Sequence, residues 1–173
     1  LDVAAENANI GLDVVRNMST GDPPQSATSG GGTFHPLTPQ RILDTRTGLG
    51  APASRLGAGG TLSLQVTGAG GVPASGVSAV VLNVTVTEPT ACSFLTVSPT
   101  GEARPLASNL NYGAGQTVPN LVMAKVGAGG KVDLYTSSGT THVIADVAGW
   151  HGPGTDPPGG RYTPVTPARI LDT

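Results

Sequence analysis

The sequence predicts an all-β fold: a single antiparallel β-sandwich or jelly roll of about eight strands. Two observations lead to this prediction. The 173 residues include 26 glycines and 15 prolines, which indicate frequent turns. Between these turns lie short runs in which apolar and polar residues alternate with a period of two, as in sheets that pack on one face. A chain of this length can bury a substantial core.

Composition excludes several classes of function. Charged residues make up only 12% of the chain and the net charge is −2, which gives no electrostatic basis for binding nucleic acid. The single cysteine, Cys92, excludes an intramolecular disulfide and a cysteine-based metal cluster. The sequence contains no run of apolar residues long enough to cross a bilayer, so we expect no membrane insertion.

The first 20 residues differ from the rest of the chain and predict an N-terminal helical segment, residues 1–20. They contain no proline, and their apolar residues fall on one helical stripe: Leu1, Ala5, Ala8, Leu12 and Val15. Gly11 weakens this helix, and an alternating strand through residues 10–14 remains an alternative. Residues 21–33 have the composition of a flexible linker.

Residues 34–151 carry the alternating runs and are predicted to form the sandwich. Strands are expected at 41–46, 61–66, 78–87, 94–98, 108–113, 121–126, 131–136 and 141–150. In the run 78–87 the apolar residues share one face: Val80, Leu82, Val84 and Val86. This face is the predicted core. A second Gly/Pro-rich linker follows at residues 152–160.

One segment of the chain occurs twice. Residues 34–45 read FHPLTPQRILDT and residues 162–173 read YTPVTPARILDT, with 8 of 12 positions identical at a constant offset of 128. Self-similarity at a fixed offset is typical of tandem repeats. Residues 161–173 are therefore predicted to be the first strand of a following copy of the same domain.

Four stretches of residues 34–151 closely resemble a tandem β-sandwich repeat module of large secreted actinobacterial proteins. They are RILDTR, VVLNVTVTEPT, SNLNYGAGQTVPNLV and VIADVAGW. In that family the module stands in tandem or is appended to extracellular hydrolases. The resemblance implies a secreted protein, extracellular or at the cell surface, and a non-catalytic role. It supplies no catalytic or ligand residues.

Three aromatic residues are the candidate ligand contacts: Tyr112, Tyr135 and Trp150. Exposed aromatic rings can stack on sugar rings, whose C–H groups pack on the π surface. Tyr135 alternates with core-facing Leu134 and is expected to face outward. Trp150 ends the last predicted strand, where it could cap the core instead of binding a ligand.

The sparse charged residues are interpreted as structural. Arg41, Asp44 and Arg46 flank the first predicted strand, where a salt bridge or a turn carboxylate is favoured over a ligand-binding cluster. Asp133 and Asp146 lie on predicted neighbouring strands and could share a calcium ion. Calcium needs 6 to 8 oxygen ligands, however, and the sequence has no calcium-loop motif. We therefore expect no metal site.

The sequence thus predicts a non-catalytic extracellular repeat module that acts as a structural spacer, stalk or fibre subunit. We expect no catalytic residues and no cofactor, because no nucleophile elbow or metal motif is present. The alternative is a carbohydrate- or cell-wall-binding module that anchors an attached hydrolase. Expected partners are a second copy of the chain, in a head-to-tail assembly through residues 161–173, and a polysaccharide or cell-wall surface.

Overall fold

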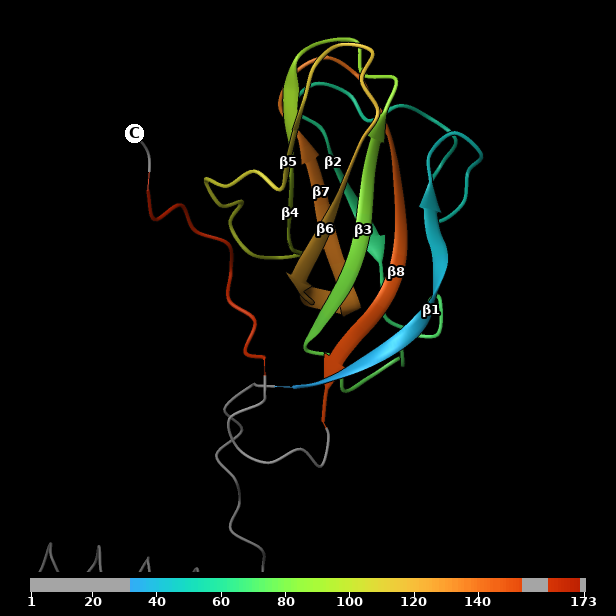
Figure 1. Cartoon of the computed structure of the whole chain (residues 1–173), viewed down its shortest axis with the longest axis vertical. Helices are drawn as coiled ribbons and strands as arrows, with labels where there is room; N and C mark the ends of the chain where they lie inside the picture. The colour runs from blue at the N-terminus through green and yellow to red at the C-terminus, as the bar shows by residue number, and fades with distance from the viewer. Residues whose placement is uncertain (1–31, 154–161, 172–173) are drawn as a thin grey trace, which may run out of the picture.

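The computed structural model describes residues 32–153 and 162–171 of the chain. Eight strands form two four-stranded antiparallel sheets that face each other, as in a β-sandwich (Figure 1). The all-β prediction is confirmed for this part of the chain. The predicted N-terminal helix, residues 1–20, lies outside the described residues. Within them, no helix is long and apolar enough to cross a membrane.

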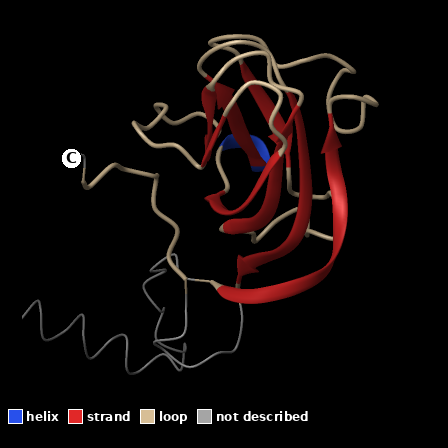
Figure 2. Cartoon of the chain, turned by 45° about the horizontal axis from the view of Figure 1, so that its top comes forward, coloured by secondary structure: helices blue, strands red, loops and turns tan. Residues whose placement is uncertain are grey.

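In the described residues, strands provide nearly all of the regular structure, apart from one short 3₁₀ turn, η1 (Figure 2). In chain order the elements are β1 Thr33–Asp44, β2 Thr61–Gln65, β3 Ala79–Thr87, β4 Ser93–Pro99, β5 Leu110–Tyr112, β6 Val118–Lys125, η1 Ala128–Gly130, β7 Lys131–Thr136 and β8 His142–Gly152. The strand positions agree with the alternating runs of the sequence, with differences at the ends of β1, β5 and β6.

The order of the strands shows how the chain is rolled. One sheet has the order β1-β8-β3-β6 and the other has the order β2-β7-β4-β5. Strands β1 and β2, β8 and β7, β3 and β4, and β6 and β5 therefore occupy matching positions in the two sheets. Each of these consecutive pairs spans both layers, which is the arrangement of a jelly roll.

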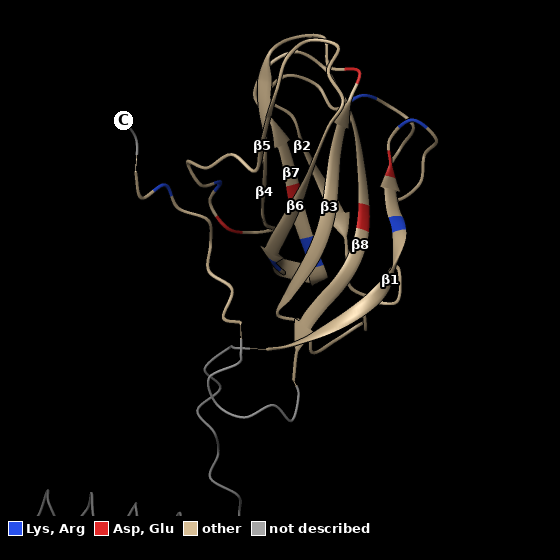
Figure 3. Cartoon of the chain, viewed as in Figure 1, with Lys and Arg blue, Asp and Glu red and all other residues tan. Residues whose placement is uncertain are grey.

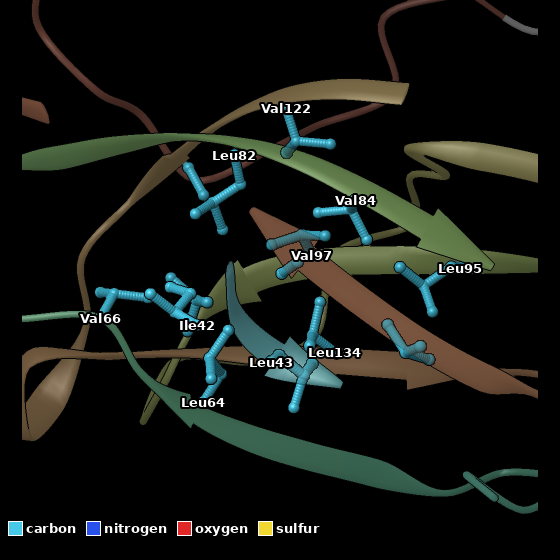
Figure 4. Packing of buried hydrophobic residues seen from close by; sticks show 14 of the residues in the cluster. Ile42, Leu43, Leu64, Val66, Leu82, Val84, Leu95, Val97, Val122 and Leu134 are labelled. Carbon is cyan, nitrogen blue, oxygen red and sulfur yellow. The ribbon is translucent and has the colours of Figure 1, made fainter. Parts of the chain in front are cut away.

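The core fills the space between the sheets, and Figure 4 shows its packing. The apolar face predicted for residues 78–87 is fully buried: Val80, Leu82, Val84 and Val86 each have 0% exposure. The inward residues of the other strands join them, among them Ile42 and Leu43 of β1. Burial of a single Leu or Val side chain stabilises the fold by about 1.5–3 kcal/mol.

Strand β1 is longer than the sequence predicts. The prediction starts at residue 41, whereas β1 begins at Thr33 and includes Pro36 and Pro39. Proline cannot donate a hydrogen bond to a neighbouring strand, so it argues against a strand unless that strand lies at an edge. β1 is an edge strand, and its register with β8 shifts between Pro36 and Gln40. The edge position therefore tolerates both prolines.

Strand β5 is shorter than predicted because a loop takes over on its N-terminal side. The side-chain oxygen of Asn109 accepts a hydrogen bond from the Val97 amide at 2.7 Å, in place of a strand pairing. The hydroxyl of Thr96 on β4 donates to the carbonyl of Ala107 at 2.6 Å and is fully buried. The loop of residues 100–109 thus covers part of the outer face of the sheet β2-β7-β4-β5.

Candidate functional site

Tyr112 is buried, so its ring is closed to any ligand. Only 5% of the residue is exposed, and its side chain belongs to the core. Its hydroxyl is satisfied by a hydrogen bond with the hydroxyl of Thr136 on β7. Leu110 and Tyr112 share the inward face of β5, whereas Asn111 between them is exposed. The interpretation of Tyr112 as a ligand contact is therefore wrong.

Trp150 caps the core, as the alternative interpretation of the sequence allowed. It is half-buried and packs against the core cluster. The register places it between His35 on β1 and Val80 on β3. The His35 imidazole stacks on the indole with ring centroids 4.0 Å apart and planes inclined by 13°. One face of the indole is thus occupied by a neighbouring ring, so Trp150 is a poor platform for a sugar.

Tyr135 faces outward from β7, as predicted, because Leu134 and Thr136 on either side are buried. The structure adds a residue that sequence reasoning missed. The guanidinium carbon of Arg104 lies 3.9 Å from the centroid of the Tyr135 ring, in a cation–π contact. The ring of Phe94 also lies near Tyr135, with centroids 6.2 Å apart and planes inclined by 49°. One face of Tyr135 is therefore covered by a cation.

A small pocket adjoins this pair on the outer face of the sheet. Its lining comes mainly from residues 104–108 of the loop, together with Phe94 of β4 and Asn111 of β5. Arg169 of the repeated segment also reaches it. Arg104 both lines the pocket and contacts the Tyr135 ring. Tyr135 does not line the pocket itself, but two of the residues that do, Phe94 and Arg104, contact its ring.

A second charged site lies at the end of β1, where Asp44 is almost fully buried with 3% exposure. The Arg46 guanidinium donates to both carboxylate oxygens, at 2.9 and 2.7 Å, and the Arg46 amide donates to one of them at 3.0 Å. Arg41 adds an ion pair to Asp44 at 3.4 Å. The backbone carbonyl of Asp44 accepts hydrogen bonds from the amides of Thr47, Gly48 and Leu49. Asp44 thus fixes the turn that follows β1.

Charged positions occur on both of the neighbouring strands β1 and β8 (Figure 3). Arg41 also pairs with Asp146 of β8 at 2.8 Å, which links the edge strand to its neighbour. Hydrogen bonds from Arg46 lower the pKa of Asp44 from 3.8 to about 2. These contacts support the structural interpretation of Arg41, Asp44 and Arg46 over a ligand-binding cluster, because the carboxylate is already saturated by the chain's own donors.

The alternative of a shared calcium site at Asp133 and Asp146 is wrong. The two residues lie on β7 and β8, which belong to opposite sheets, and each faces outward from its own sheet. The Asp133 carboxylate accepts hydrogen bonds from the hydroxyls of Ser63 and Thr100, both at 2.6 Å. Among residues 32–153 and 162–171, no group of three or more His, Cys, Asp and Glu side chains could hold a metal ion.

Residues 162–171, the repeated segment, contact the domain but add no full strand to it. Tyr162 and Gly32 form an isolated antiparallel bridge, with backbone hydrogen bonds of 2.8 and 3.1 Å. The Tyr162 ring also packs against His151 with centroids 4.6 Å apart. Farther along, the hydroxyl of Thr166 donates to Glu102 in the loop of residues 100–109.

The apolar residues of this repeated segment have a different environment from their equivalents in β1. Ile42 and Leu43 are 5% and 0% exposed, whereas Ile170 and Leu171 at the matching positions are 98% and 76% exposed. The same sequence is therefore core in one copy and surface in the other.

Compared with known proteins, the sequence matches no family model and no curated protein. Functional inference for this chain therefore rests on its repeat, its fold and its surface chemistry.

Proposed function

We propose that residues 33–153 form a non-catalytic extracellular repeat module, which serves as a structural spacer, stalk or fibre unit in a tandem array. The observation that carries this proposal is the repeated segment of residues 162–171. It is similar in sequence to β1, with the Arg-Ile-Leu run identical, yet its Ile170 and Leu171 are exposed. A strand with two large apolar residues on its inner face needs a sheet and a core to cover them. A second copy of the domain would provide both.

The chemistry of the surface agrees with a structural role. The buried carboxylate of Asp44 forms ion pairs with two arginines and fixes the turn after β1. The side chain of Asn109 accepts a hydrogen bond from the Val97 amide and fixes a loop. The start of the repeated segment is held against the domain as well, since Tyr162 pairs with Gly32, just before β1. An array built in this way would hold successive modules at a defined distance, outside the cell that secretes it.

The proposal is tested by the shape of proteins that contain one, two and three copies of residues 33–160 in tandem. Small-angle X-ray scattering is expected to give a maximum dimension that grows by a constant increment with each copy, as for beads on a rod. A maximum dimension that hardly grows, because the copies collapse into one globule, would refute the spacer role.

Head-to-tail association of separate chains is a related proposal. The exposed apolar residues of the repeated segment could dock on a sheet of a second chain, and such a contact propagates when it does not close. Light scattering on the whole chain and on residues 1–160 would compare their masses. A concentration-dependent mass that falls to the monomer in the truncated protein supports the assembly, and equal monomeric masses for both would rule it out.

A second candidate function is the binding of a polysaccharide or cell-wall surface by the module, so that an attached hydrolase stays near its substrate. The observation that favours it is the group of Tyr135, Arg104 and Phe94 beside a surface pocket. Pull-down of the protein on insoluble peptidoglycan, chitin and cellulose tests it. Retention that is lost on replacing Tyr135 with alanine is expected, and no retention on any polymer would leave only the structural role.

A further inference from the structure

We propose that the outer face of the sheet β2-β7-β4-β5 binds a carboxylate-bearing polysaccharide, with Arg104 as the residue that recognises the carboxylate. The inference rests on the second candidate function, the binding of a polysaccharide, and narrows its ligand to acidic chains such as polyuronates. It concerns the pocket formed by Phe94, Arg104, Ser108 and Asn111 next to Tyr135.

Arg104 differs from the other arginines of the domain. Arg41, Arg46 and Arg55 each form an ion pair with a carboxylate of the chain. Arg104 pairs with no carboxylate in the part of the chain that the structure describes, although it is exposed at the rim of a pocket. In a chain with so few charges, a cation that lies on an aromatic ring without an anionic partner is available to a ligand.

The contact with Tyr135 prepares Arg104 for this role. An arginine side chain has many rotamers, and part of this conformational freedom is lost when a ligand fixes the side chain. The aromatic ring, 3.9 Å from the guanidinium carbon, already restricts the side chain before a ligand arrives. The planar guanidinium presents paired N–H donors, and two of them match the two oxygens of a carboxylate.

The neighbouring side chains favour a sugar. Ser108 and Asn111 are exposed, and neither side chain forms a hydrogen bond within residues 32–153 and 162–171. Their hydroxyl and amide groups can bond to sugar hydroxyls, while the half-buried ring of Phe94 offers an apolar surface to C–H groups. An acidic peptide is less well suited, because the adjacent edge strand β5 has only three residues to which a peptide strand could pair.

The charges on the outer face of this sheet favour an anion only weakly, so a single module is expected to bind its ligand weakly. Lys131 and Asp133 of β7 also face outward, and the Asp133 carboxylate is held by Ser63 and Thr100. Arg104 and Lys131 together outweigh Asp133, so the local charge favours an anion. The excess is small and exposed to solvent, so binding is expected to weaken with salt. Repetition of the module along an array would raise the strength of attachment through several sites on one polymer.

The test is isothermal titration of the full chain with soluble oligogalacturonate and with the same oligomer after methyl esterification. Binding of the acid form only is expected. Arg104→Gln should weaken it at least about tenfold, since a hydrogen bond to a charged group contributes roughly 1.5–3 kcal/mol. The matched control is Arg55→Gln, which removes an arginine that already pairs with Glu88. This control should bind like the wild type.

The second variant separates the two parts of the site. Tyr135→Phe keeps the aromatic ring and should retain binding, whereas Tyr135→Ala should weaken it several-fold by releasing Arg104. An unchanged thermal midpoint of Arg104→Gln shows that the variant remains folded.

The inference is overturned by the absence of binding to the acid form, by equal binding of the ester, or by an equal loss in Arg55→Gln. Retention on neutral chitin or cellulose without binding of oligogalacturonate would preserve polysaccharide binding as a function and refute the carboxylate site. Equally tight, Arg104-dependent binding of poly-glutamate would assign the site to acidic peptides and overturn the assignment to a polysaccharide.

Discussion

Replacing Asp44 with asparagine is expected to lower the free energy of unfolding by between about 1 and 2 kcal/mol at neutral pH. The variant keeps the shape of the side chain and one acceptor for the Arg46 amide, but it removes the charge that both arginines face. The pKa of Asp44 is lowered from 3.8 to about 2 in the folded protein. Since one pKa unit corresponds to about 1.4 kcal/mol, the full shift sets an upper limit of about 2.5 kcal/mol.

The expected loss of unfolding free energy is smaller than this limit because the partners of Asp44 are partly exposed to water. The side chains of Arg41 and Arg46 are 44% and 42% exposed, while that of Asp44 is 5% exposed. Solvent and salt screen the outer ends of such pairs, so part of the attraction is lost. The hydrogen bonds at the buried carboxylate are shielded from solvent. Their contribution is therefore not reduced by screening, and their loss accounts for most of the expected effect.

The loss of stability in Asp44→Asn should depend on pH. A folded-state pKa below the ordinary value means that the stabilisation is present above about pH 4 and is lost as the pH falls toward 2. The difference in stability between the wild type and Asp44→Asn should therefore be largest near pH 7 and shrink over this acidic range. The other carboxylates titrate in both proteins, so their contributions cancel in the difference.

Urea titrations between pH 2 and pH 7, followed by the fluorescence of Trp150, measure the difference directly. The control is Glu88→Gln, which removes an ion pair whose carboxylate side chain is 59% exposed and which should change stability by less than about 0.5 kcal/mol. If Asp44→Asn costs no more than this control at pH 7, or if its cost is the same at pH 2, the account of Asp44 as a buried structural carboxylate fails.

Further changes test the packing of the core by urea denaturation. Leu82→Ala should cost about 2–5 kcal/mol because Leu82 is fully buried, whereas Leu121→Ala, at a side chain that is 63% exposed, should stay within about 0.5 kcal/mol. Similar costs for both would contradict the assigned inward face. Val84→Asp places a charge in the core and should prevent folding, so soluble protein with a native circular dichroism spectrum would refute the register of β3. Tyr112→Phe should cost about 1 kcal/mol by removing the hydrogen bond with the Thr136 hydroxyl, which keeps only its longer contact with Ser93, and no measurable cost would show that this hydrogen bond contributes little.

Much of the fold could be predicted because alternation is a local property. The period of two in residues 78–87 is enough to separate the inward face from the outward face, and the structure confirms that face. The structural role of Asp44 follows from its place beside two arginines at the end of a strand. Even the burial of Tyr112 had a signal in the sequence, because it lies two residues after Leu110 and so shares its face.

The features that sequence reasoning missed depend on contacts between distant parts of the chain. The prolines of β1 are compatible with a strand only at an edge, and the edge position is known only once all eight strands are arranged. The error over Asp133 and Asp146 has the same cause, since consecutive strands of a jelly roll fall in opposite sheets. The pairing of Arg104 with Tyr135 joins a loop to a strand through the tertiary fold, and alternation carries no information about it.

The central claim is that the repeated segment is the first strand of a second module. It is tested most directly by fusing residues 46–153 after residue 173, so that the segment regains the sequence that follows β1. Hydrogen exchange measured by NMR should then show strong protection of the Ile170 and Leu171 amides, together with a second cooperative unfolding unit. Fast exchange at both amides, with the added residues unfolded, would contradict the account.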